Sequence, residues 1–573
     1  MPTELDKIMQ ATMDAMTADG APLATVPYEK YGQQLPMLAM APPSLSHYFA
    51  HFCTQHGDAE FLVDGDVRLS FADALAGAQQ VARGLIAEHG LQKGDRVGIA
   101  ARNSANWIVA YMGILMAGGV ATLLNGWWQG EELAHGITSV GCNLVLADEQ
   151  RAARLADQAL PDSVTIVIFE HDSTPQAGLA PVIGGALDSD SALPELNGDD
   201  LATILFTSGS TGQSKGAYSD HRGVMQGTAS YIAQTMMSLQ ILIKLGQPPQ
   251  GQPATLLNVP LFHVTAMVPV LLQSIGIGRK LVLMPKWDAE HAMQLIEREK
   301  VSYFVGVPLM SYEIATHHDR DKYDLTSCTA FAAGGAPRPV EHVKRIKKEM
   351  DWAFPLLGYG LTETNGVGCG NFNENYMAKP DSTGTPSRPL VDLAILDDDG
   401  KPLPQGEIGE ISIRSICNFL GYWDNEEATR AAIMPDGYFR TGDLGYLDED
   451  NYLFIVDRKK DIVIRGGENI SCIEVEAAIY AHPDVAQACV FGLPDERFGE
   501  VPGAVYHMKE GKSLEPEALQ EFLGQHLAPF KIPTRIWHSS EVLPILGTQK
   551  IDKVTLRKQY RELVAAEDRV SVH

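Results

Sequence analysis

The sequence predicts an α/β protein: a large N-terminal domain of stacked α/β sheets with a small barrel-like subdomain, followed by a small α+β C-terminal domain. From Val97 to about residue 320, apolar strands alternate with helical patterns, which is typical of largely parallel sheets. After about residue 388 the strands become shorter and are separated by glycine turns, which favours an antiparallel or barrel-like unit. From Asp461 onward, mixed helix and strand patterns indicate a compact further domain.

Local signals predict the individual elements in order. A helix starts within Pro43–Cys53, Glu60–Leu69 alternates as two short strands, and Ser70 caps the next helix. Further apolar strands are predicted at Asn143–Ala147, Val164–Phe169, Leu201–Phe206, Thr255–Val259, Lys280–Met284 and Val301–Val305. The stretch Pro175–Asp200 is rich in Gly, Pro, Ser and Asp and reads as a surface connection. The C-terminal elements are predicted as a helix at Ile473–Ala481, a strand at Ala486–Phe491, a helix at Glu515–Leu527 and a last helix from Asp552.

Composition excludes several classes of function. The chain of 573 residues carries a net charge of -27, which argues against nucleic acid and against docking on an anionic membrane through a basic face. Its seven cysteines are scattered and form no CxxC pair, so neither a disulfide framework nor a zinc site is indicated. This pattern fits a reducing compartment, and the N-terminus lacks a secretory signal, so we expect a cytoplasmic protein.

One segment needs a separate interpretation because it is uncharged over a long stretch. Asn103–Gly130 is long enough to span a membrane. However, Gly118-Gly119 splits it, and Asn125 and Gln129 lie near its end. A transmembrane helix is therefore the alternative, and we favour a buried helix through Ala117, a glycine turn and a short strand.

The most informative stretch is an apolar strand followed by a loop of glycines and hydroxyl residues. The strand Leu201–Phe206 runs into Thr207-Ser208-Gly209-Ser210-Thr211-Gly212-Gln213-Ser214-Lys215-Gly216. Glycines let backbone N–H groups approach a ligand, hydroxyls add donors and lysine adds positive charge, so the loop suits a polyphosphate. It is not a Walker A loop, because Ser214 precedes Lys215 and Gly216 follows it. A flexible turn is the alternative reading.

At nine of ten positions this loop resembles the phosphate loop of the adenylate-forming (ANL) superfamily, which includes acyl-CoA synthetases, luciferases and peptide-synthetase adenylation domains. That family usually has proline where this chain has Ser214. Further motifs follow in the family's order, so the resemblance covers nearly the whole chain. It implies that the phosphates of ATP are bound by Thr207, Ser208, Gly209, Ser210, Thr211, Gly212 and Lys215.

Two further motifs concern the acyl pocket and the adenine. Pro260-Leu261-Phe262-His263 resembles the motif whose histidine lines the acyl pocket near the substrate carboxylate, and a core histidine is the alternative. Amino-acid-activating relatives usually have aspartate there, so His263 argues against an amino acid substrate. Gly334-Gly335-Ala336-Pro337 resembles the adenine-side loop, although a plain turn has the same composition. The resemblance implies nucleotide contacts from Gly335, Ala336 and Pro337.

The motif Tyr359-Gly360-Leu361-Thr362-Glu363-Thr364 is more specific. By resemblance, Tyr359 stacks on adenine beside Gly360, and Thr362 reaches the α-phosphate. Glu363 would hold Mg²⁺, a role that suits a carboxylate because Mg²⁺ prefers hard oxygen ligands and shares them with phosphates. A helix-start cap is the alternative reading of this pair.

The next two motifs resemble the family's ribose-binding and hinge segments. Tyr438-Phe439-Arg440-Thr441-Gly442-Asp443 resembles the motif whose acid accepts both ribose hydroxyls, and carboxylates are natural two-point acceptors. Within Asp457–Asp461, Arg458 matches a second ribose contact and Lys460 falls at the family's hinge position. As a bare sequence this run is a solvated group of charges.

Two motifs of the C-terminal domain complete the set. Arg465–Ile470 resembles the loop that lines the pantetheine tunnel, with Gly466 and Gly467 lying against a narrow ligand. Leu543–Ile551 resembles the catalytic-lysine motif, with Lys550 as the lysine, although the family more often has Gly where this chain has Gln549. The implied catalytic residues are Lys550, Glu363, Thr207 and His263.

The resemblance implies an ATP-dependent acyl-CoA synthetase, an acid–thiol ligase that uses ATP, Mg²⁺ and coenzyme A. A carboxylic acid and ATP would give acyl-AMP and pyrophosphate, and the thiol of coenzyme A would then give acyl-CoA and AMP. The implied domains are 1–457 (AMP-binding and acyl pocket), 458–461 (hinge) and 462–573 (mobile, with the catalytic lysine). The run Val264–Leu272 is uncharged, so we expect a medium- or long-chain fatty acid, with an aryl or arylalkanoic acid as the alternative.

Other functions remain open at this point. Within the superfamily they are a luciferase-like oxygenase and an adenylation domain serving a carrier protein. The chain ends soon after Lys550, which leaves no room for an attached carrier domain but keeps a separate one open. From another class, a non-catalytic nucleotide-binding protein is opposed by the joint presence of Glu363, Asp443 and Lys550. We expect small-molecule partners, no nucleic acid, no integral membrane span, and a homodimer on family grounds alone.

Overall fold

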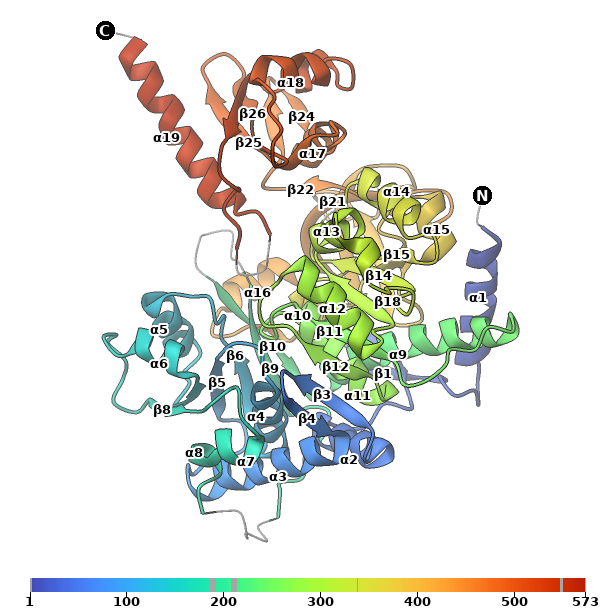
Figure 1. The fold of residues 1–573 in the computed structure, drawn as a ribbon, viewed down its shortest axis with the longest axis vertical. Helices are drawn as coiled ribbons and strands as arrows, with labels where there is room; N and C mark the ends of the chain where they lie inside the picture. Colours follow the sequence, from blue (N-terminus) through green and yellow to red (C-terminus); the bar gives the residue numbers. More distant parts are fainter. Residues whose placement is uncertain (1–2, 186–191, 208–213, 337, 547–549, 572–573) are drawn as a thin grey trace.

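The computed structural model describes residues 3–185, 192–207, 214–336, 338–546 and 550–571. Within these residues the strands form two large sheets, a small antiparallel sheet, a C-terminal sheet and an N-terminal hairpin. Helices flank the large sheets, and the C-terminal elements lie at one end of the molecule, drawn in orange and red in Figure 1. The predicted α/β class, with a large N-terminal part and a small C-terminal domain, is confirmed.

The first large sheet carries the strand before the predicted phosphate loop. Its described strands follow the order β20-β10-β9-β6-β5-β7-β8. Pairing is parallel from β9 to β8, whereas β10 and β20 join antiparallel at one edge. The bounds are β5 (Arg96–Ala100), β6 (Val120–Leu123), β7 (Leu144–Ala147), β8 (Thr165–Ile168), β9 (Leu201–Thr207), β10 (Lys215–Asp220) and β20 (Gly421–Tyr422).

The second large sheet carries the strands before the predicted adenine and metal motifs. Its described strands follow the order β17-β16-β15-β14-β13-β11-β12-β3-β4, parallel from β15 to β3. The bounds are β3 (Glu60–Asp64), β4 (Val67–Ser70), β11 (Ala254–Leu257), β12 (Lys280–Leu283), β13 (Tyr303–Gly306), β14 (Ala330–Gly334), β15 (Phe354–Tyr359), β16 (Cys369–Asn371) and β17 (Thr385–Pro386). Buried side chains from α2–α4 and from both sheets form one hydrophobic cluster, so the core lies between the sheets.

Local sequence explains how several helices begin. At the start of α3, Ser70 and Asp73 form a reciprocal capping box, as the sequence predicts. The helices of the N-terminal part are α1 (Glu4–Thr17), α2 (Leu45–His56), α3 (Phe71–Ala87), α4 (Ala105–Met116), α5 (Gly130–Ser139), α6 (Glu149–Leu155), α7 (Pro175–Gly178), α8 (Ala180–Ile183), α9 (His221–Lys244), α10 (Val264–Ala266), α11 (Gln273–Ile277), α12 (Ala289–Glu299), α13 (Pro308–Thr316), α14 (Val340–Glu349), α15 (Asn373–Ala378) and α16 (Glu426–Ala432). Shorter turns are the π-helix η2 (Met267–Leu272) and the 3-10 helices η3 (Arg320–Lys322) and η4 (Thr362–Thr364).

The uncharged segment Asn103–Gly130 is a buried helix followed by a strand. Every residue of α4 is buried, Gly118 then adopts a φ of 82°, and β6 enters the first sheet. Among the helices in the described ranges, none is long and apolar enough to cross a membrane. The prediction of a buried helix, glycine turn and strand is therefore confirmed.

The stretch Pro175–Asp200 is not only a surface connection, so that prediction is wrong for its first part. The short helices α7 and α8 lie there, and Leu179, Val182 and Ile183 are buried in the main core. A Cβ built on Gly84 of α3 would lie 2.4 Å from the carbonyl oxygen of Val182. Glycine in α3 therefore lets this segment approach closely, a tertiary contact that composition does not reveal.

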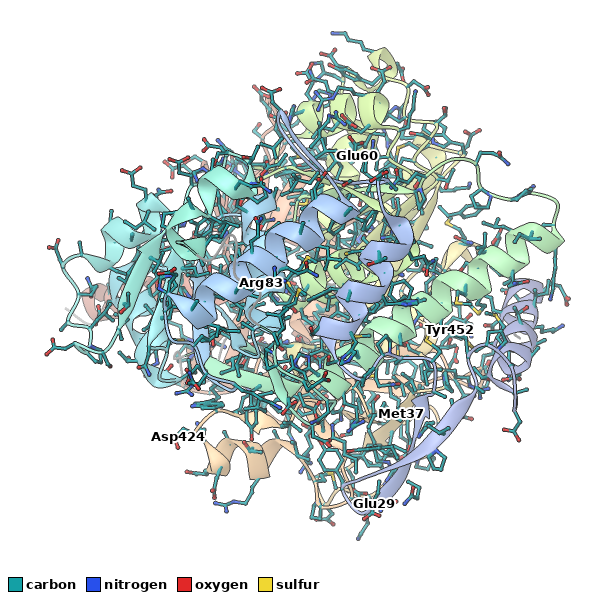
Figure 2. All side chains as sticks on the ribbon, turned by 90° about the horizontal axis from the view of Figure 1, so that it is seen from below. Glu29, Met37, Glu60, Arg83, Asp424 and Tyr452 are labelled. Carbon is teal, nitrogen blue, oxygen red and sulfur yellow. The ribbon has the colours of Figure 1, made fainter. Side chains whose placement is uncertain are left out.

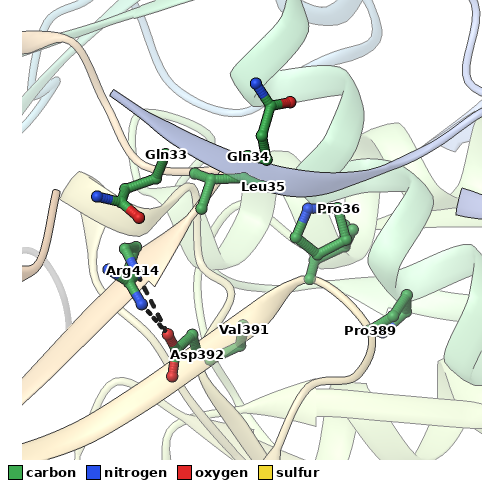
Figure 3. Close-up of a pocket in the computed structure, with 9 residues that line it drawn as sticks. Gln33, Gln34, Leu35, Pro36, Pro389, Val391, Asp392 and Arg414 are labelled. Atoms are coloured by element: carbon green, nitrogen blue, oxygen red, sulfur yellow. Dashed lines mark hydrogen bonds and ion pairs between the residues drawn. The ribbon is translucent and has the colours of Figure 1, made fainter. Parts of the chain in front are cut away.

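The small antiparallel sheet follows the predicted change near residue 388. Its described strands are β18 (Val391–Leu396), β19 (Gly409–Ser415), β21 (Phe439–Leu447) and β22 (Leu453–Arg458), in that order. Next to it lies the N-terminal hairpin of β1 (Thr25–Lys30) and β2 (Gln33–Leu38), which carries Glu29 and Met37 of Figure 2. A pocket of about 150 Å³ separates β2 from β18, and Arg414 and Asp392 pair at 2.6 Å on its wall (Figure 3). No residue predicted for the functional site lines this pocket.

The C-terminal sheet has its own core. It contains β23 (Val463–Arg465), β24 (Glu468–Ile470), β25 (Val485–Asp495), β26 (Gly499–Met508) and β27 (Arg535–Ser539). Around it lie α17 (Cys472–Tyr480), α18 (Pro516–Leu523), η5 (Pro529–Lys531) and α19 (Lys553–Ser571). The turn 459–461 joins β22 to β23, which belong to different sheets. A hinge at 458–461 stays a prediction.

Polar and aromatic contacts form a seam between the C-terminal elements and the large part. Lys509 Nζ donates a hydrogen bond to the Tyr312 hydroxyl at 3.0 Å, and Tyr312 stacks on His342 with ring centroids 4.1 Å apart. Tyr480 of α17 meets His342 edge-on at 6.0 Å. Near the turn, the buried carboxylate of Asp457 accepts hydrogen bonds from the first backbone N–H groups of α17. These contacts hold the C-terminal domain in the orientation of Figure 1.

Candidate active site

The small antiparallel sheet brings the predicted ribose-binding residues together. Asp443 and Arg458 are register partners on β21 and β22, and Arg458 Nε lies 3.1 Å from Asp443 Oδ1. The Tyr359 hydroxyl, at the end of β15, donates a hydrogen bond to Asp443 Oδ2 at 2.7 Å. Burial, together with the charge of Asp443, holds the pKa of Tyr359 well above its usual value, so the hydroxyl stays a donor. Asp443 is therefore a buried carboxylate with fixed orientation.

Lys550 reaches this cluster from the C-terminal domain. A Cβ built on Gly335 would lie 3.3 Å from Lys550 Cε and 3.5 Å from Nζ, so glycine at the end of β14 leaves room for the lysine. Leu546 N–H donates to the Lys550 carbonyl at 2.7 Å, and Ile545 pairs with Ile551 in an antiparallel bridge, which fixes the backbone at Lys550. Burial lowers the pKa of Lys550 to about 8; Arg458 also lowers it, whereas Asp443 opposes the shift.

Glu363 is a buried carboxylate held from one side. It lies in η4, is 8% exposed, and accepts a hydrogen bond from the Tyr422 hydroxyl at 2.8 Å. Burial raises its pKa, and the hydrogen bond from Tyr422 opposes that shift. Lys215 Nζ lies 5.2 Å from the centroid of the same Tyr422 ring. Tyr422 therefore links the end of the phosphate loop to the predicted metal ligand.

The strands on either side of the phosphate loop are in place. Thr207 and Lys215 are register partners at the ends of β9 and β10, so the residues that flank the predicted phosphate loop lie next to each other. The predicted ligands Ser208, Gly209, Ser210, Thr211 and Gly212 lie outside the described residues, as does Pro337. Ala336 follows Gly335 directly, just beyond β14.

His263 takes the position that precedes α10. Burial and the nearby charge of Lys550 together lower its pKa to about 3, so the imidazole is neutral at physiological pH. Its Nε2 has no hydrogen-bond partner among the described residues. A neutral ring with a free nitrogen, close to Lys550, suits contact with a bound ligand better than a purely structural role.

The loop after β15 is shaped by glycine. A Cβ built on Gly360 would lie 2.1 Å from the carbonyl oxygen of Gly366, so no other residue fits. This tight turn leads directly into Thr362 and Glu363 of η4. Thr362 and Glu363 therefore follow within four residues of Tyr359, whose hydroxyl meets Asp443.

Gly466 and Gly467 are not part of this cluster. They form the turn between β23 and β24 with φ values of 59° and 95°. Gly466 packs against Phe498, and a Cβ on Gly467 would meet no atom within 4 Å. The described contacts thus leave the predicted tunnel loop apart from Lys550 and Asp443.

The sequence analysis does not single out Tyr422, whose hydroxyl contacts Glu363 and whose ring lies near Lys215. The hydroxyl reaches Glu363 across 59 positions of sequence, because β20 pairs with β10 beside the phosphate loop. No local pattern marks a two-residue strand at Gly421–Tyr422. The residue becomes visible only when the sheet is assembled.

Comparisons with known proteins agree with this geometry. A family model described as AMP-binding enzyme matches residues 49–423, and one described as AMP-binding enzyme C-terminal domain matches residues 474–550. The chain belongs to the AMP-binding enzyme family. It is an AMP-forming acyl-CoA ligase, an enzyme class whose substrates include ATP and coenzyme A. The non-catalytic alternative is not supported.

Relatives with different acyl substrates are similarly distant. The chain is 32% identical over 503 residues to the long-chain-fatty-acid–CoA ligase FadD13 of Mycobacterium tuberculosis, covering 87% of this chain and 94% of that protein. It is 31% identical over 497 residues to a feruloyl-CoA synthase of an Amycolatopsis species, covering 87% and 95%. Identity at this level leaves the acid undecided.

Two solved structures of one relative match the chain to different degrees. ATP-bound MatB from Rhodopseudomonas palustris superposes with a TM-score of 0.80 at 28% identity, covering 90% of this chain and 99% of that one. The apo form of the same protein gives a TM-score of 0.70. The chain as a whole therefore superposes better on the ATP-bound structure than on the apo structure of this relative.

Proposed function

We propose that this ligase activates a medium- or long-chain fatty acid, with Lys550, Glu363, Thr207 and His263 as its catalytic residues. The observation that carries the choice of acid is the apolar wall that follows His263. Val264, Met267, Val268 and Leu271 are buried and belong to the main core cluster. Such a wall favours an alkyl chain over a polar acid. The 31% identity to a feruloyl-CoA synthase keeps an aryl acid as the second candidate.

In the first step the substrate carboxylate attacks the α-phosphorus of ATP, and the bond to the leaving pyrophosphate breaks. Such transfers depend on positioning and on neutralising charge, so buried cations are effective. Lys550, whose ammonium lies beside Gly335, would stabilise the charge that develops on the α-phosphate. Thr207 and Lys215 frame the phosphate loop on the other side. The neutral His263 would orient the acid by donating a hydrogen bond from Nε2–H to a carboxylate oxygen.

The residues present fit one magnesium ion at Glu363. Its buried carboxylate is oriented by Tyr422, and no described lysine or arginine forms an ion pair with it. Across the described residues there is no group of three or more His, Cys, Asp or Glu that could hold a metal alone. An ion at Glu363 would therefore share its ligands with the phosphates of ATP, where it would neutralise charge on the leaving group.

Nucleotide binding completes the proposal. Asp443, fixed by Arg458 and Tyr359, would accept the ribose hydroxyls. By the resemblance, Gly335, Ala336, Pro337 and Gly360 would border the adenine. Thr362 would contact the α-phosphate, one residue from Glu363. In the second step the thiol of coenzyme A attacks the acyl carbonyl, and AMP leaves. Gly466 and Gly467 would line the thiol's path only after the C-terminal domain rotates about the hinge at 458–461.

A pyrophosphate-exchange assay tests the function. ATP–pyrophosphate exchange should depend on an added acid and respond to saturated acids of medium and long chain, followed by consumption of coenzyme A thiol. Exchange that responds to cinnamic or benzoic acids and not to alkanoic acids would overturn the choice of substrate. If exchange occurs but the thiol of coenzyme A is not consumed, coenzyme A is not the acyl acceptor.

The pKa of Lys550 leads to a prediction about pH. Because this pKa is lowered to about 8, the ammonium is present below that pH and is lost as pH rises through it. We expect kcat/KM for adenylate formation to fall above about pH 8, since kcat/KM reports the free enzyme. Lys550→Arg should move this decline to higher pH, because a guanidinium stays charged. A wild-type profile that stays level well above pH 8 would contradict the assignment.

Lys460 provides a test of the hinge. It is exposed in the turn after β22, and proline there would fix φ and restrict residue 459. Because the structure has Lys550 turned inward, we expect Lys460→Pro to slow thioester formation more than adenylate formation. Lys460→Ala is the control, since it removes the charge and keeps the backbone free. Equal slowing of both half-reactions by Lys460→Pro would count against a hinge at this residue.

A further inference from the structure

One face of the second large sheet leads away from the nucleotide site. Gly334 and Gly358 are register partners at the end next to Gly335. Two residues before them lie the register partners Ala332 and Leu356. Two residues before Ala332 lies Ala330, whose register partner on β13 is Tyr303. Side chains alternate along strands, so these positions share one face, and four residues span about 13 Å. This face forms a strip of suitable length for a medium-chain acyl group.

Side chains along the strip keep accessible surface inside the fold. Leu356 and Tyr303, and Tyr231 from the facing helix α9, are only partly buried although they pack against the main core cluster. Burial raises the pKa of both tyrosines, so they do not face open water. The Tyr231 hydroxyl donates to the Gly366 carbonyl at 2.6 Å, next to Val264. An acyl chain laid along this strip would run from the residues after His263 toward Tyr303.

A buried arginine lies at the Tyr303 end of this strip. Arg279 is 5% exposed, and its guanidinium carbon lies 4.9 Å from the centroid of the Tyr303 ring. Its Nη2 donates to Gln273 Oε1 at 3.3 Å, and Gln273 is itself held by Thr235 at 2.7 Å. Its Nη1 has no hydrogen-bond partner in the described part of the chain. One arm of the guanidinium is thus held by Gln273, and the other is buried without a hydrogen-bond partner.

The charge of Arg279 is not balanced from within the described chain. No described Asp or Glu forms an ion pair with it. Burial lowers the pKa of Arg279 to about 10, and the nearby Tyr303 opposes this shift. A buried charge is costly unless it is paired. Tyr303 and Gln273 support the guanidinium from two sides, but they leave Nη1 unsatisfied. A planar guanidinium is well suited to bind a carboxylate through two hydrogen bonds.

We propose that Arg279 binds a second carboxylate at the far end of the acyl chain, so that the preferred substrate is a medium-chain α,ω-dicarboxylic acid. The inference rests on the proposed function, because it takes the reacting carboxylate to lie beside His263. The methylene groups would lie along Ala332 and Leu356, and the distal carboxylate would meet Nη1 of Arg279. The strip thus selects both a length and a charge.

Wild-type enzyme provides the first test. ATP–pyrophosphate exchange is measured with octanedioic to tetradecanedioic acids, with the monocarboxylic acids of equal length and with the monomethyl esters of the diacids. We expect one diacid length to exceed its monocarboxylic counterpart and its ester by at least about 100-fold in kcat/KM, because an unpaired buried group rejects a ligand that lacks the partner.

Two variants and a control separate binding from packing. Arg279→Met keeps the side-chain length and removes the charge, so it should reverse the preference toward the monocarboxylic acid, mainly through KM for the diacid. Tyr303→Phe keeps the ring under the guanidinium and should keep the diacid preference. Arg388→Met, at an exposed arginine that pairs only distantly with Asp14, serves as the control and should leave both rates unchanged. Thermal unfolding of each variant reports whether it folds.

The outcomes are distinguishable. A wild-type enzyme that uses monocarboxylic acids as well as diacids at every length would overturn the role of Arg279 and leave the proposed function standing. Loss of activity toward both kinds of acid in folded Arg279→Met, in equal proportion, would assign a structural role and overturn the inference. If no carboxylic acid of the series supports exchange, the proposed function fails and the inference fails with it.

Discussion

Replacing Lys550 by alanine is expected to reduce adenylate formation by about 100- to 1000-fold, the range for loss of one preorganised charge-stabilising donor. The ammonium lies beside Gly335 and close to Asp443 and Arg458, where the α-phosphate of a nucleotide bound through its ribose would lie. Thioester formation from supplied acyl-AMP should remain within a few-fold of wild type, because that step releases AMP and needs no further charge at this position. Single-turnover assays of the two half-reactions measure the difference.

Lys558→Ala is the matched control for this experiment. Lys558 lies on α19, eight residues after Lys550 in the sequence, and is exposed. Its removal should leave both half-reactions unchanged. If Lys550→Ala slowed thioester formation as much as adenylate formation, the assignment of Lys550 to the first step alone would be rejected.

Replacing Glu363 by glutamine is expected to lower kcat/KM for adenylate formation by about 100-fold and to raise the Mg²⁺ concentration needed for half-maximal rate. Glutamine keeps the shape and can still accept the hydrogen bond from Tyr422, so the change removes charge with little change in packing. Because burial raises the pKa of Glu363, the wild-type Mg²⁺ requirement should also increase as pH falls. Titration of the exchange rate with MgCl₂ at several pH values measures both effects.

Tyr422→Phe separates the charge of Glu363 from its orientation. Losing this hydrogen bond to a charged acceptor should cost about tenfold in rate, corresponding to roughly 1.5 kcal/mol. The phenyl ring keeps its contact with Lys215. If Glu363→Gln left the Mg²⁺ requirement unchanged, Glu363 would not be a metal ligand and its carboxylate would have a structural role.

Sequence patterns predict the parts of the fold that are locally encoded. The buried helix within Asn103–Gly130, the capping box at Ser70 and the strand Leu201–Phe206 all follow from periodicity, caps and glycines. The short helices α7 and α8 do not, because the composition of Pro175–Asp200 is that of a turn and its buried side chains depend on glycine in α3.

The same limit applies to the site. Motif resemblance brings forward Asp443, Tyr359 and Lys550, and the structure places their side chains in one cluster. Tyr422 and Arg279 carry no motif, since each acts through partners that are distant in sequence or on a neighbouring strand. Their importance depends on sheet register and on the absence of a charge partner, which are properties of the assembled fold.

The seam formed by Tyr312, His342, Tyr480 and Lys509 has a consequence for attempts to engineer a more heat-resistant enzyme. If the C-terminal domain rotates once in every turnover, the contacts of Lys509 and Tyr480 across the seam must part and form again each time. Contacts of this kind contribute only about 0.5–1.5 kcal/mol each, which keeps both orientations accessible. A disulfide or a larger apolar contact introduced there would raise the melting temperature and lower the turnover number together, so stabilising substitutions belong in the two domain cores instead.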